Sequence, residues 1–319
     1  MSVSRSVGFV YDDVFLEHLT PPGHPERPDR LRAIVQHLRQ CGLWNTLRHI
    51  VPFAASDQQL ITVHAREHIE YVKSICTAGG GLLDEGDTHA SIDSFEVALH
   101  AAGAVLAAID AVAAKTIDTA FCAIRPPGHH AEYKRPMGFC IFNNVAVGAR
   151  YAQQKHNLKK VAIVDWDVHH GNGTQHIFEA DPSVLYISLH QYPFYPGKGA
   201  RSERGIGEGE GYTLNIPLPA GTGEERYLQA FREEVVPALA QFKPDLLMIS
   251  AGFDAHKDDP LAGMKLTDGS FAAMTAFMNE VSANQCEGRI VSVLEGGYNL
   301  EALAASVEAH LRELQKLAD

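Results

Sequence analysis

Short apolar segments rich in β-branched residues alternate along the chain with longer amphipathic or alanine-rich segments. The short segments have the length and composition of buried strands, and the longer ones those of helices. This alternation predicts an α/β fold with a mostly parallel central sheet and helices on its faces. The predicted strands lie within 7–13, 119–126, 161–170, 184–190, 212–218, 245–254 and 289–298, and the best helix candidates are 94–114, 143–156, 225–241 and 300–317.

Length and composition predict a single domain. The chain has 319 residues, 45% of them hydrophobic, which is enough to bury one large α/β core. The glycine-rich segments 79–86, 197–211 and 219–223 are too short and too interspersed with structured segments to be linkers, so we expect loops there. We therefore predict one domain over residues 1–319.

Charge and composition exclude several classes of protein. The formal net charge of -12 argues against nonspecific nucleic-acid binding, which needs Lys and Arg to neutralise phosphates, and favours a basic partner. We find no secretory leader and no apolar run near the roughly 20 residues of a membrane span, so we expect a cytoplasmic protein without membrane contact. The five cysteines are widely separated and form no C-x-x-C pair, which predicts reduced core thiols and no thiolate zinc site.

Polar side chains gather where the predicted strands end. In parallel sheets, ligands bind outside the carboxyl ends of the strands, so these residues are the first candidates for a site. An ionised carboxylate beside an apolar run is costly unless it has a partner, either hydrogen bonds or a cation. The residues at these ends are His129, His130, Asp165, Asp167, His169, His170, Asp254 and Tyr298.

Two carboxylates and one imidazole from these ends suit a three-ligand Zn²⁺ site with an open position for water or a carbonyl oxygen. Asp167 and His169 are two residues apart at an extended strand end, so their side chains face the same side. Asp254 follows an independent strand and supplies the third ligand. Alternatives stay open, since the D-x-H pair also suits a hydrogen-bonded cap and Asp254 suits a helix N-cap.

Hydrolysis at such a site also needs a base and a donor to the developing oxyanion. A rigid Pro-Pro-Gly turn fixes the imidazoles of His129 and His130, and Asp165 is available to orient one of them. Tyr298, after a Gly-Gly pair, is the candidate oxyanion donor. Each feature alone also fits a structural role, such as an exposed histidine pair or a half-buried ring, and only their conjunction favours catalysis.

The motifs that carry these residues together resemble those of zinc-dependent histone deacetylases, particularly the class II and bacterial deacetylase-like amidohydrolases. They are "RPPGHHAE", "GFCIFNNVAVGA", "DWDVHHGNGTQ", "SLHQYPFYPG", "SAGFDAHKDDPLAG" and "LEGGYNL", in family order over nearly the whole chain. The resemblance implies a three-layer α/β sandwich, the arginase/deacetylase fold. The implied zinc ligands are Asp167, His169 and Asp254, and the implied catalytic residues are His129, His130, Asp165 and Tyr298.

The resemblance also implies a role for each of these residues. Asp165 would bond His129, while His130 would act as the general base for water and then protonate the leaving amine. A monovalent cation, usually potassium, sits beside the zinc in this family. The residues implied for that cation are Asp165, Asp167, His169, Ser188 and Leu189.

Substrate contacts are implied by the same resemblance. Phe139 and Tyr195 match the two ring walls of an acyl-lysine tunnel, with Tyr195 where many relatives have phenylalanine, and Gly138 lies beside Phe139. Asp87 aligns with a rim aspartate that grips the substrate backbone in several relatives. Leu261 stands where some polyamine deacetylases carry a glutamate, which favours acyl-lysine over a polyamine.

We therefore expect a zinc-dependent amidohydrolase that cleaves N-acetylated lysine in peptides or proteins and releases acetate. The enzymatic alternative is hydrolysis of acetylpolyamines or another small N-acyl amine. A non-catalytic acyl-lysine reader and an arginase-like ureohydrolase with two manganese ions are disfavoured, because the ligands, tandem histidines and tyrosine are all present. The oligomeric state, the physiological substrate, the acyl preference and the choice between zinc and iron are left open.

Overall fold

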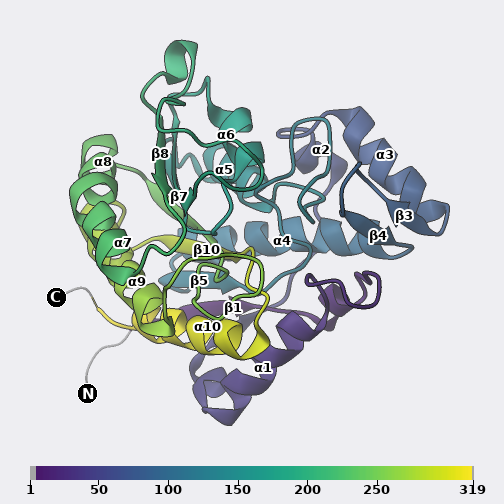
Figure 1. Cartoon of the computed structure of the whole chain (residues 1–319), viewed down its shortest axis with the longest axis horizontal. Coiled ribbons are helices and arrows are strands. Elements are labelled where there is room, and N and C mark those ends of the chain that lie inside the picture. The colour runs from purple at the N-terminus through teal and green to yellow at the C-terminus, as the bar shows by residue number, and fades with distance from the viewer. Residues whose placement is uncertain (1–4, 318–319) are drawn as a thin grey trace.

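An eight-stranded parallel sheet forms the centre of the protein (Figure 1). The computed structural model of the chain describes residues 5–317. The strand order is β2-β1-β5-β10-β9-β6-β7-β8, and each neighbouring pair is parallel, which confirms the predicted sheet. The strands are β1 Val7–Val10, β2 Arg48–Ile50, β5 Thr119–Cys122, β6 Val161–Asp165, β7 Val184–Gln191, β8 Thr213–Leu218, β9 Leu246–Ala251 and β10 Ile290–Leu294.

Helices pack on both faces of the sheet and complete the predicted three-layer sandwich (Figure 1). On one face α4 packs against α5, and on the other α1, α10 and α9 pack in series. The best helix candidates are confirmed, with 225–241 forming α7 and α8 around a π-helical segment at Phe231–Val235. The helices are α1 Asp29–Gln40, α2 Asp57–Leu60, α3 Arg66–Thr77, α4 Ser94–Ala113, α5 Asn144–His156, α6 Asn172–Phe178, α7 Glu224–Ala230, α8 Val236–Phe242, α9 Asp268–Gln285 and α10 Leu300–Leu314.

Several elements were not among the predicted ones. The charged residues of α1 obscured an apolar face at helical spacing, which comprises Leu31, Ile34, Val35 and Leu38. The edge strand β2 is only three residues long, too short to give a pattern. The expected loop 79–86 contains β3 (Gly80–Leu82), which pairs antiparallel with β4 (His89–Ser91) in a separate sheet.

The longest helix, α4, corrects an expectation about membranes. Its 20 residues are apolar enough, by length and composition, to cross a membrane, so the statement that no run approaches a membrane span is wrong. In the folded protein, however, 78% of its most apolar window is buried. α4 contacts β5, β10 and α5, which is the environment of a core helix.

The cysteines depart from the expected core thiols at one position. All five are free, and Cys76, Cys122, Cys140 and Cys286 are buried as expected. Cys41, at the end of α1, is partly exposed instead. This residue lies beside the helical layer formed by α1 and α10, and its thiol donates to the carbonyl oxygen of Leu38 at 3.6 Å.

The strand order brings the chemically important strand ends together. β5, β10, β9 and β6 are neighbours in the sheet, and the segments that follow them carry, in the same order, His129, Tyr298, Asp254 and Asp167. Because these strands are parallel, their carboxyl ends meet at one edge of the sheet. The topology thus gathers distant parts of the sequence at a single place.

A buried ion cluster ties the N-terminal segment to two of these strand ends. Glu26 is 0% exposed, and its carboxylate lies 2.5 and 2.8 Å from Arg125 and 3.3 Å from Arg30. Arg125 follows β5, and Arg30 donates to the carbonyl oxygen of Gly297 at 2.7 Å, after β10. Burial acts to raise the pKa of Glu26, but Arg125 and His18 outweigh it and hold that pKa well below its ordinary value.

Glu26→Gln is expected to lower the free energy of unfolding by about 3–5 kcal/mol, because it leaves two arginines buried without their anion. The depressed pKa means that the contribution of Glu26 is present above the ordinary glutamate pKa and is lost as the pH falls through the folded-state value. The variant should therefore lose less stability on acidification than the wild type. Urea unfolding across this pH range measures both effects, with the exposed Glu96→Gln as control, and a loss below about 1 kcal/mol would contradict the cluster's importance.

Candidate active site

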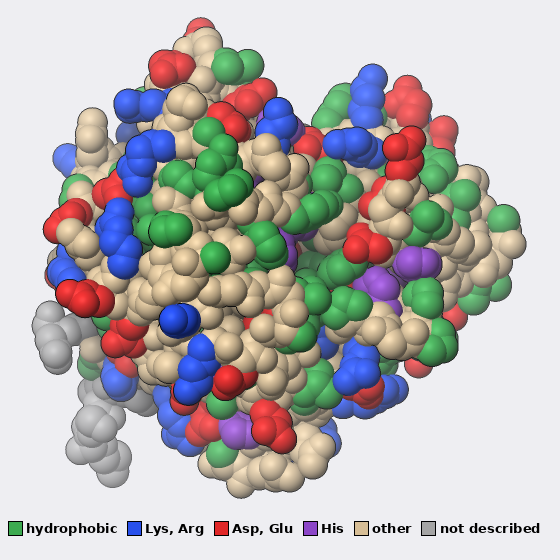
Figure 2. All heavy atoms as spheres, viewed as in Figure 1, with side chains coloured by type: hydrophobic (Ala, Val, Ile, Leu, Met, Phe, Trp, Pro, Cys, Tyr) green, Lys and Arg blue, Asp and Glu red, His purple; other side chains and the backbone are tan. Residues whose placement is uncertain are grey.

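A pocket of about 230 Å³ opens at the carboxyl edge of the sheet. Figure 2 shows a hollow on this face of the molecule, with histidine and hydrophobic side chains on its walls. The structure thus collects in one cavity all the residues expected to contact substrate, together with three expected to act on it. The lining residues are Asp87, His130, Gly138, Phe139, His169, Tyr195, Leu261 and Tyr298.

The expected metal ligands lie together at the base of this pocket. Nδ1 of His169 is 3.0 Å from Oδ1 of Asp167 and 3.1 Å from Oδ2 of Asp254. All three side chains offer ligand atoms within 4.8 Å of one another, and both aspartates are buried. The adjacency of β6 and β9 creates this cluster, because Asp167 follows the first strand and Asp254 the second.

The electrostatics of this trio fit a divalent cation. Burial and the nearby charge of Asp167 raise the pKa of Asp254 above its ordinary value. Burial would lower the pKa of His169, but the two carboxylates raise it to about 10. The cluster therefore attracts positive charge, and two carboxylate oxygens with one imidazole nitrogen are a donor set that Zn²⁺ accepts.

Glycine at position 296 allows the backbone after β10 to approach these carboxylates. A Cβ atom on Gly296 would lie 2.1 Å from Oδ2 of Asp254 and 2.6 Å from Oδ2 of Asp167, closer than real atoms come. The Gly296 N–H instead donates to Oδ2 of Asp167 at 2.7 Å. The Gly-Gly pair before Tyr298 is thus explained by close packing against the carboxylates of the trio.

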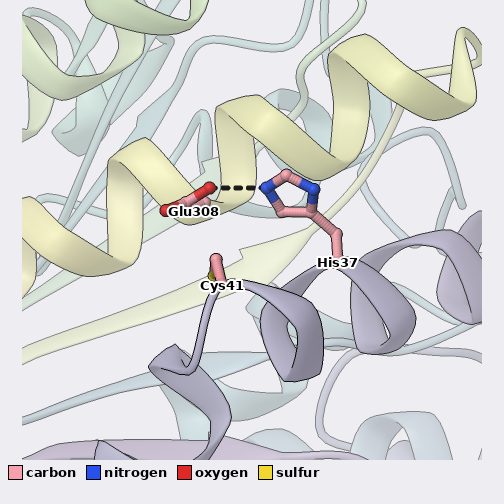
Figure 3. Close-up of side chains that lie close together, drawn as sticks. All are labelled: His37, Cys41 and Glu308. Atoms are coloured by element: carbon pink, nitrogen blue, oxygen red, sulfur yellow. Dashed lines mark hydrogen bonds and ion pairs between the residues drawn. The ribbon is translucent and has the colours of Figure 1, made fainter.

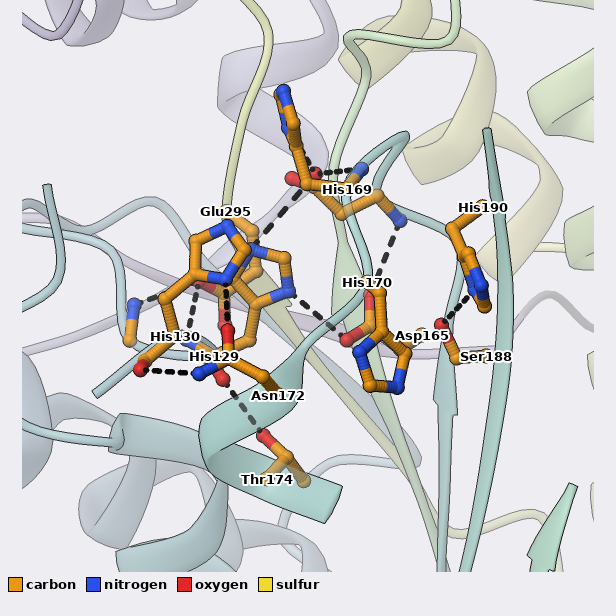
Figure 4. A network of polar contacts seen from close by, with 12 residues as sticks. His129, His130, Asp165, His169, His170, Asn172, Thr174, Ser188, His190 and Glu295 are labelled. Carbon is orange, nitrogen blue, oxygen red and sulfur yellow. Dashed lines mark hydrogen bonds and ion pairs between the residues drawn. The ribbon is translucent and has the colours of Figure 1, made fainter. Parts of the chain in front are cut away.

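The two adjacent histidines have different partners (Figure 4). Nδ1 of His129 lies 3.0 Å from Oδ2 of Asp165, which also accepts a hydrogen bond from the Tyr186 hydroxyl at 3.0 Å. Nδ1 of His130 lies 2.7 Å from the amide oxygen of Asn172. One imidazole is therefore bonded to a carboxylate and the other to a neutral amide.

The surroundings of the two histidines shift their pKa values in opposite directions. Burial opposes protonation of His129, but the charges of Asp165 and Asp167 raise its pKa to about 10. Burial and the neighbouring His129 and His169 hold the pKa of His130 well below its ordinary value. In the metal-free protein these surroundings favour a protonated His129 and a neutral His130, which makes His130 the potential base of the pair.

Sequence reasoning missed the residues that hold the histidine pair. Asn172 donates its amide N–H to Glu132 at 2.5 Å, and Glu132 also lies 2.8 Å from Nδ1 of His176. Glu295, at the end of β10, accepts the backbone N–H groups of Gly128 at 2.7 Å and His129 at 3.2 Å. Glu132 and Glu295 lie within the motifs quoted above. Their partners follow other strands, and the sequence alone does not show which strand ends lie side by side.

Aromatic rings form the walls above the trio. The ring of Tyr298 packs edge to face with Phe139 at 6.0 Å, and the guanidinium of Arg30 lies 5.0 Å from its centroid. Tyr195 stands edge-on to His130 at 5.2 Å and remains 44% exposed. Gly138, with φ of 56°, passes so close to His130 that a Cβ would lie 2.5 Å from the imidazole ring.

The residues expected for a monovalent cation surround the end of β6. Asp165 is paired in register with Ser188 on the neighbouring strand β7, and Leu189 follows it. Both aspartates of this set, Ser188 and Leu189 are buried. The Ser188 hydroxyl is 2.9 Å from Nδ1 of His190, so it already has one partner (Figure 4).

Comparisons with known proteins agree with this architecture. The solved structure named "Crystal Structure of HDA15 HD domain" matches with a TM-score of 0.93 and 40% identity over 98% of this chain and 90% of that one, which identifies the arginase/deacetylase fold. The family described as "Histone deacetylase domain" matches residues 24–314, and the chain belongs to this histone deacetylase family.

Two relatives illustrate the breadth of the family. The chain is 40% identical over 315 residues to the "Histone deacetylase-like amidohydrolase" of Pseudomonas aeruginosa, covering 93% of this chain and 83% of that protein. It is 45% identical over 300 residues to "Histone deacetylase 10, chloroplastic" of Oryza sativa, covering 89% and 68% respectively. The similarity therefore extends over most of both proteins in each case.

Zinc is expected to stabilise the protein against unfolding through this trio. At a free zinc concentration of about 100 times the dissociation constant, the free energy of unfolding rises by about 2.7 kcal/mol. Asp254→Asn should lose most of this gain, because it removes one of the three ligands of the ion. Thermal unfolding with zinc and with chelator measures the gain in each protein, and an unchanged zinc response in the variant would contradict the assignment.

Proposed function

We propose that the protein is a zinc-dependent deacetylase that hydrolyses the amide of N-acetylated lysine in peptides or proteins and releases acetate, with residues 1–319 as its single catalytic domain. The observation that carries this proposal is the convergence of a metal-binding trio, a neutral imidazole and a phenol in one pocket. Asp167, His169 and Asp254 would hold the ion. When bound, zinc polarises the substrate carbonyl and makes water nucleophilic near neutral pH.

The chain's own groups complete the reaction. His130 is neutral, and its Nδ1 is engaged by Asn172, so Nε2 is the nitrogen left to take a proton from water and return it to the leaving amine. Nδ1 of His129 is held by Asp165 at 3.0 Å, and the raised pKa of His129 favours its protonated form, which would add positive charge behind His130. Tyr298 donates its hydroxyl hydrogen to the oxyanion that forms as water adds.

The pocket walls suit the methylene chain of an acetylated lysine side chain. Phe139 and Tyr195 would flank the methylene groups of the substrate, and Leu261 adds apolar surface at the mouth. Asp87 would accept hydrogen bonds from the substrate backbone at the rim. Burial and the nearby Asp84 raise the pKa of Asp87, and the presence of two carboxyl groups at this rim is the feature that favours the second candidate substrate, an acetylated polyamine.

A potassium ion is part of the same proposal. Asp165, Asp167, His169, Ser188 and Leu189 would surround it, and the buried, in-register pairing of β6 with β7 supports this. A cytoplasmic location also stays a prediction, and the plant relative bears the word "chloroplastic" in its name. Neither point affects the assigned chemistry.

Tyr298→Phe is expected to lower kcat about 10²- to 10³-fold, because it removes one oxyanion donor and little else. KM for an acetyl-lysine peptide and the melting temperature should change little. Steady-state kinetics on the zinc-loaded protein measure this, with the exposed Tyr133→Phe as the matched control. Undiminished turnover by Tyr298→Phe would remove this residue from the mechanism.

Substrate class is tested by kcat/KM on an acetyl-lysine peptide, N-acetylputrescine and acetylspermidine, measured side by side. The proposal expects preference for the peptide. Leu261→Glu should shift the ratio toward the polyamines by at least about tenfold, because one charge-assisted hydrogen bond contributes ~1.5 kcal/mol or more. A wild-type preference for polyamines would leave the catalytic assignment standing and replace the proposed substrate.

The side chain of Glu132 is proposed to position the base through Asn172. An amide has one accepting and one donating end, and Glu132 accepts from the donating end at 2.5 Å. This turns the amide oxygen of Asn172 toward His130, so Nδ1 of His130 must donate and Nε2 is left without a proton. The Glu132 carboxylate therefore sets the tautomer of a residue that it does not touch.

Glu132→Ala is expected to lower kcat by about 10- to 100-fold without a comparable change in KM. In an Asn172→Asp background, Glu132→Ala should lower kcat no further. Either carboxylate oxygen of the aspartate accepts a hydrogen bond from His130, so its orientation no longer matters. His176→Ala, which keeps the bond between Glu132 and Asn172, serves as control. Equal losses in both backgrounds would show that Glu132 does not act through Asn172.

A further inference from the structure

A second group of metal-ligand side chains lies away from the pocket, between α1 and α10 (Figure 3). His37 and Cys41 are four residues apart at the end of α1, so they lie on one side of the helix. Glu308 reaches them from α10. Each offers a ligand atom, and these atoms all lie within 4.8 Å of one another.

The carboxylate of Glu308 is oriented toward the other two side chains. Its Oε1 is held by Nε and Nη2 of Arg312, both at 2.7 Å. Its Oε2 is turned to Nε2 of His37 at 2.5 Å. The side chains of His37 and Glu308 are 34% and 21% exposed, so ions in solution can reach the cluster while its geometry is kept.

We propose that His37, Cys41 and Glu308 form a second metal site, which binds a borderline-soft divalent ion such as Zn²⁺ or Co²⁺, with water as the fourth ligand. Nitrogen, sulfur and oxygen ligands in this combination suit these ions. Binding replaces the hydrogen bond between His37 and Glu308, and the Cys41 thiol releases its proton to solvent. The thiolate and the carboxylate then oppose the ion's two charges, and Oε1 of Glu308 stays available to Arg312, so the cluster with Arg312 carries a net charge of +1.

A bound ion would join the two helices behind the Tyr298 turn. α10 begins at Leu300, and Arg30 near the start of α1 donates to the carbonyl of Gly297 at 2.7 Å. The expected consequence is a more stable pairing of α1 with α10. The site is independent of the proposed deacetylase function, and the sequence did not suggest it, because its ligands come from both ends of the chain and contain no C-x-x-C pair.

Cobalt titration of protein loaded with a single equivalent of zinc, enough for the pocket trio alone, tests the proposal, because a thiolate bound to Co²⁺ gives a near-ultraviolet charge-transfer absorption. The pocket trio contains no sulfur, but Cys140 lies within 4.8 Å of ligand atoms of His129 and Glu295, so the Cys41→Ser variant decides which thiol gives the signal. We expect it to saturate at one equivalent of added cobalt and to vanish in Cys41→Ser.

Two further variants keep the thiol and remove one other ligand. His37→Ala and Glu308→Gln should each weaken cobalt binding by at least about tenfold, whereas His100→Ala, a partly exposed helical histidine outside the cluster, should not. Absence of the charge-transfer band at millimolar cobalt would overturn the proposal. Equal binding by His37→Ala would also overturn it, since it would show that His37 is not a ligand of the metal.

Discussion

The carboxylates of Asp165, Asp167 and Asp254 are buried together at the end of the central sheet, and much of the surrounding structure serves to compensate them. Asp165 is bonded by an imidazolium and a phenol, and Asp254 accepts the backbone N–H of Val168 at 2.9 Å. Asp167 accepts the N–H of Gly296. Because burial of such charges is costly without partners, the glycines and the histidines answer one electrostatic requirement, which the proposed divalent ion would also meet.

The same requirement makes two adjacent imidazoles chemically different. Against the effect of burial, carboxylates raise the pKa of His129, whereas burial and neighbouring histidines lower the pKa of His130. Neighbouring identical residues can thus supply a fixed charge and a proton acceptor in one pocket. Two glutamates hold the groups that position this pair. Glu132 fixes the side-chain amide of Asn172, and Glu295 fixes the backbone turn before His129.

Much of this arrangement could be predicted from local patterns. The strand segments were recognisable from apolar runs, and the trio could be proposed because Asp167 and His169 share a strand end while Asp254 ends another. The pairings of Glu26 with Arg125 and of Asn172 with Glu132 could not, because only the strand order brings these segments together. The apolar α4 shows a related limit, since composition alone does not distinguish a core helix from a membrane span.

The central claim is that the trio of Asp167, His169 and Asp254 holds a catalytic zinc ion. The most direct measurement is anomalous scattering at the zinc absorption edge from crystals of the zinc-loaded protein. The account predicts a fully occupied peak between the three side chains, within about 2.0–2.2 Å of their ligand atoms. No peak there, or zinc found only between α1 and α10, would contradict it.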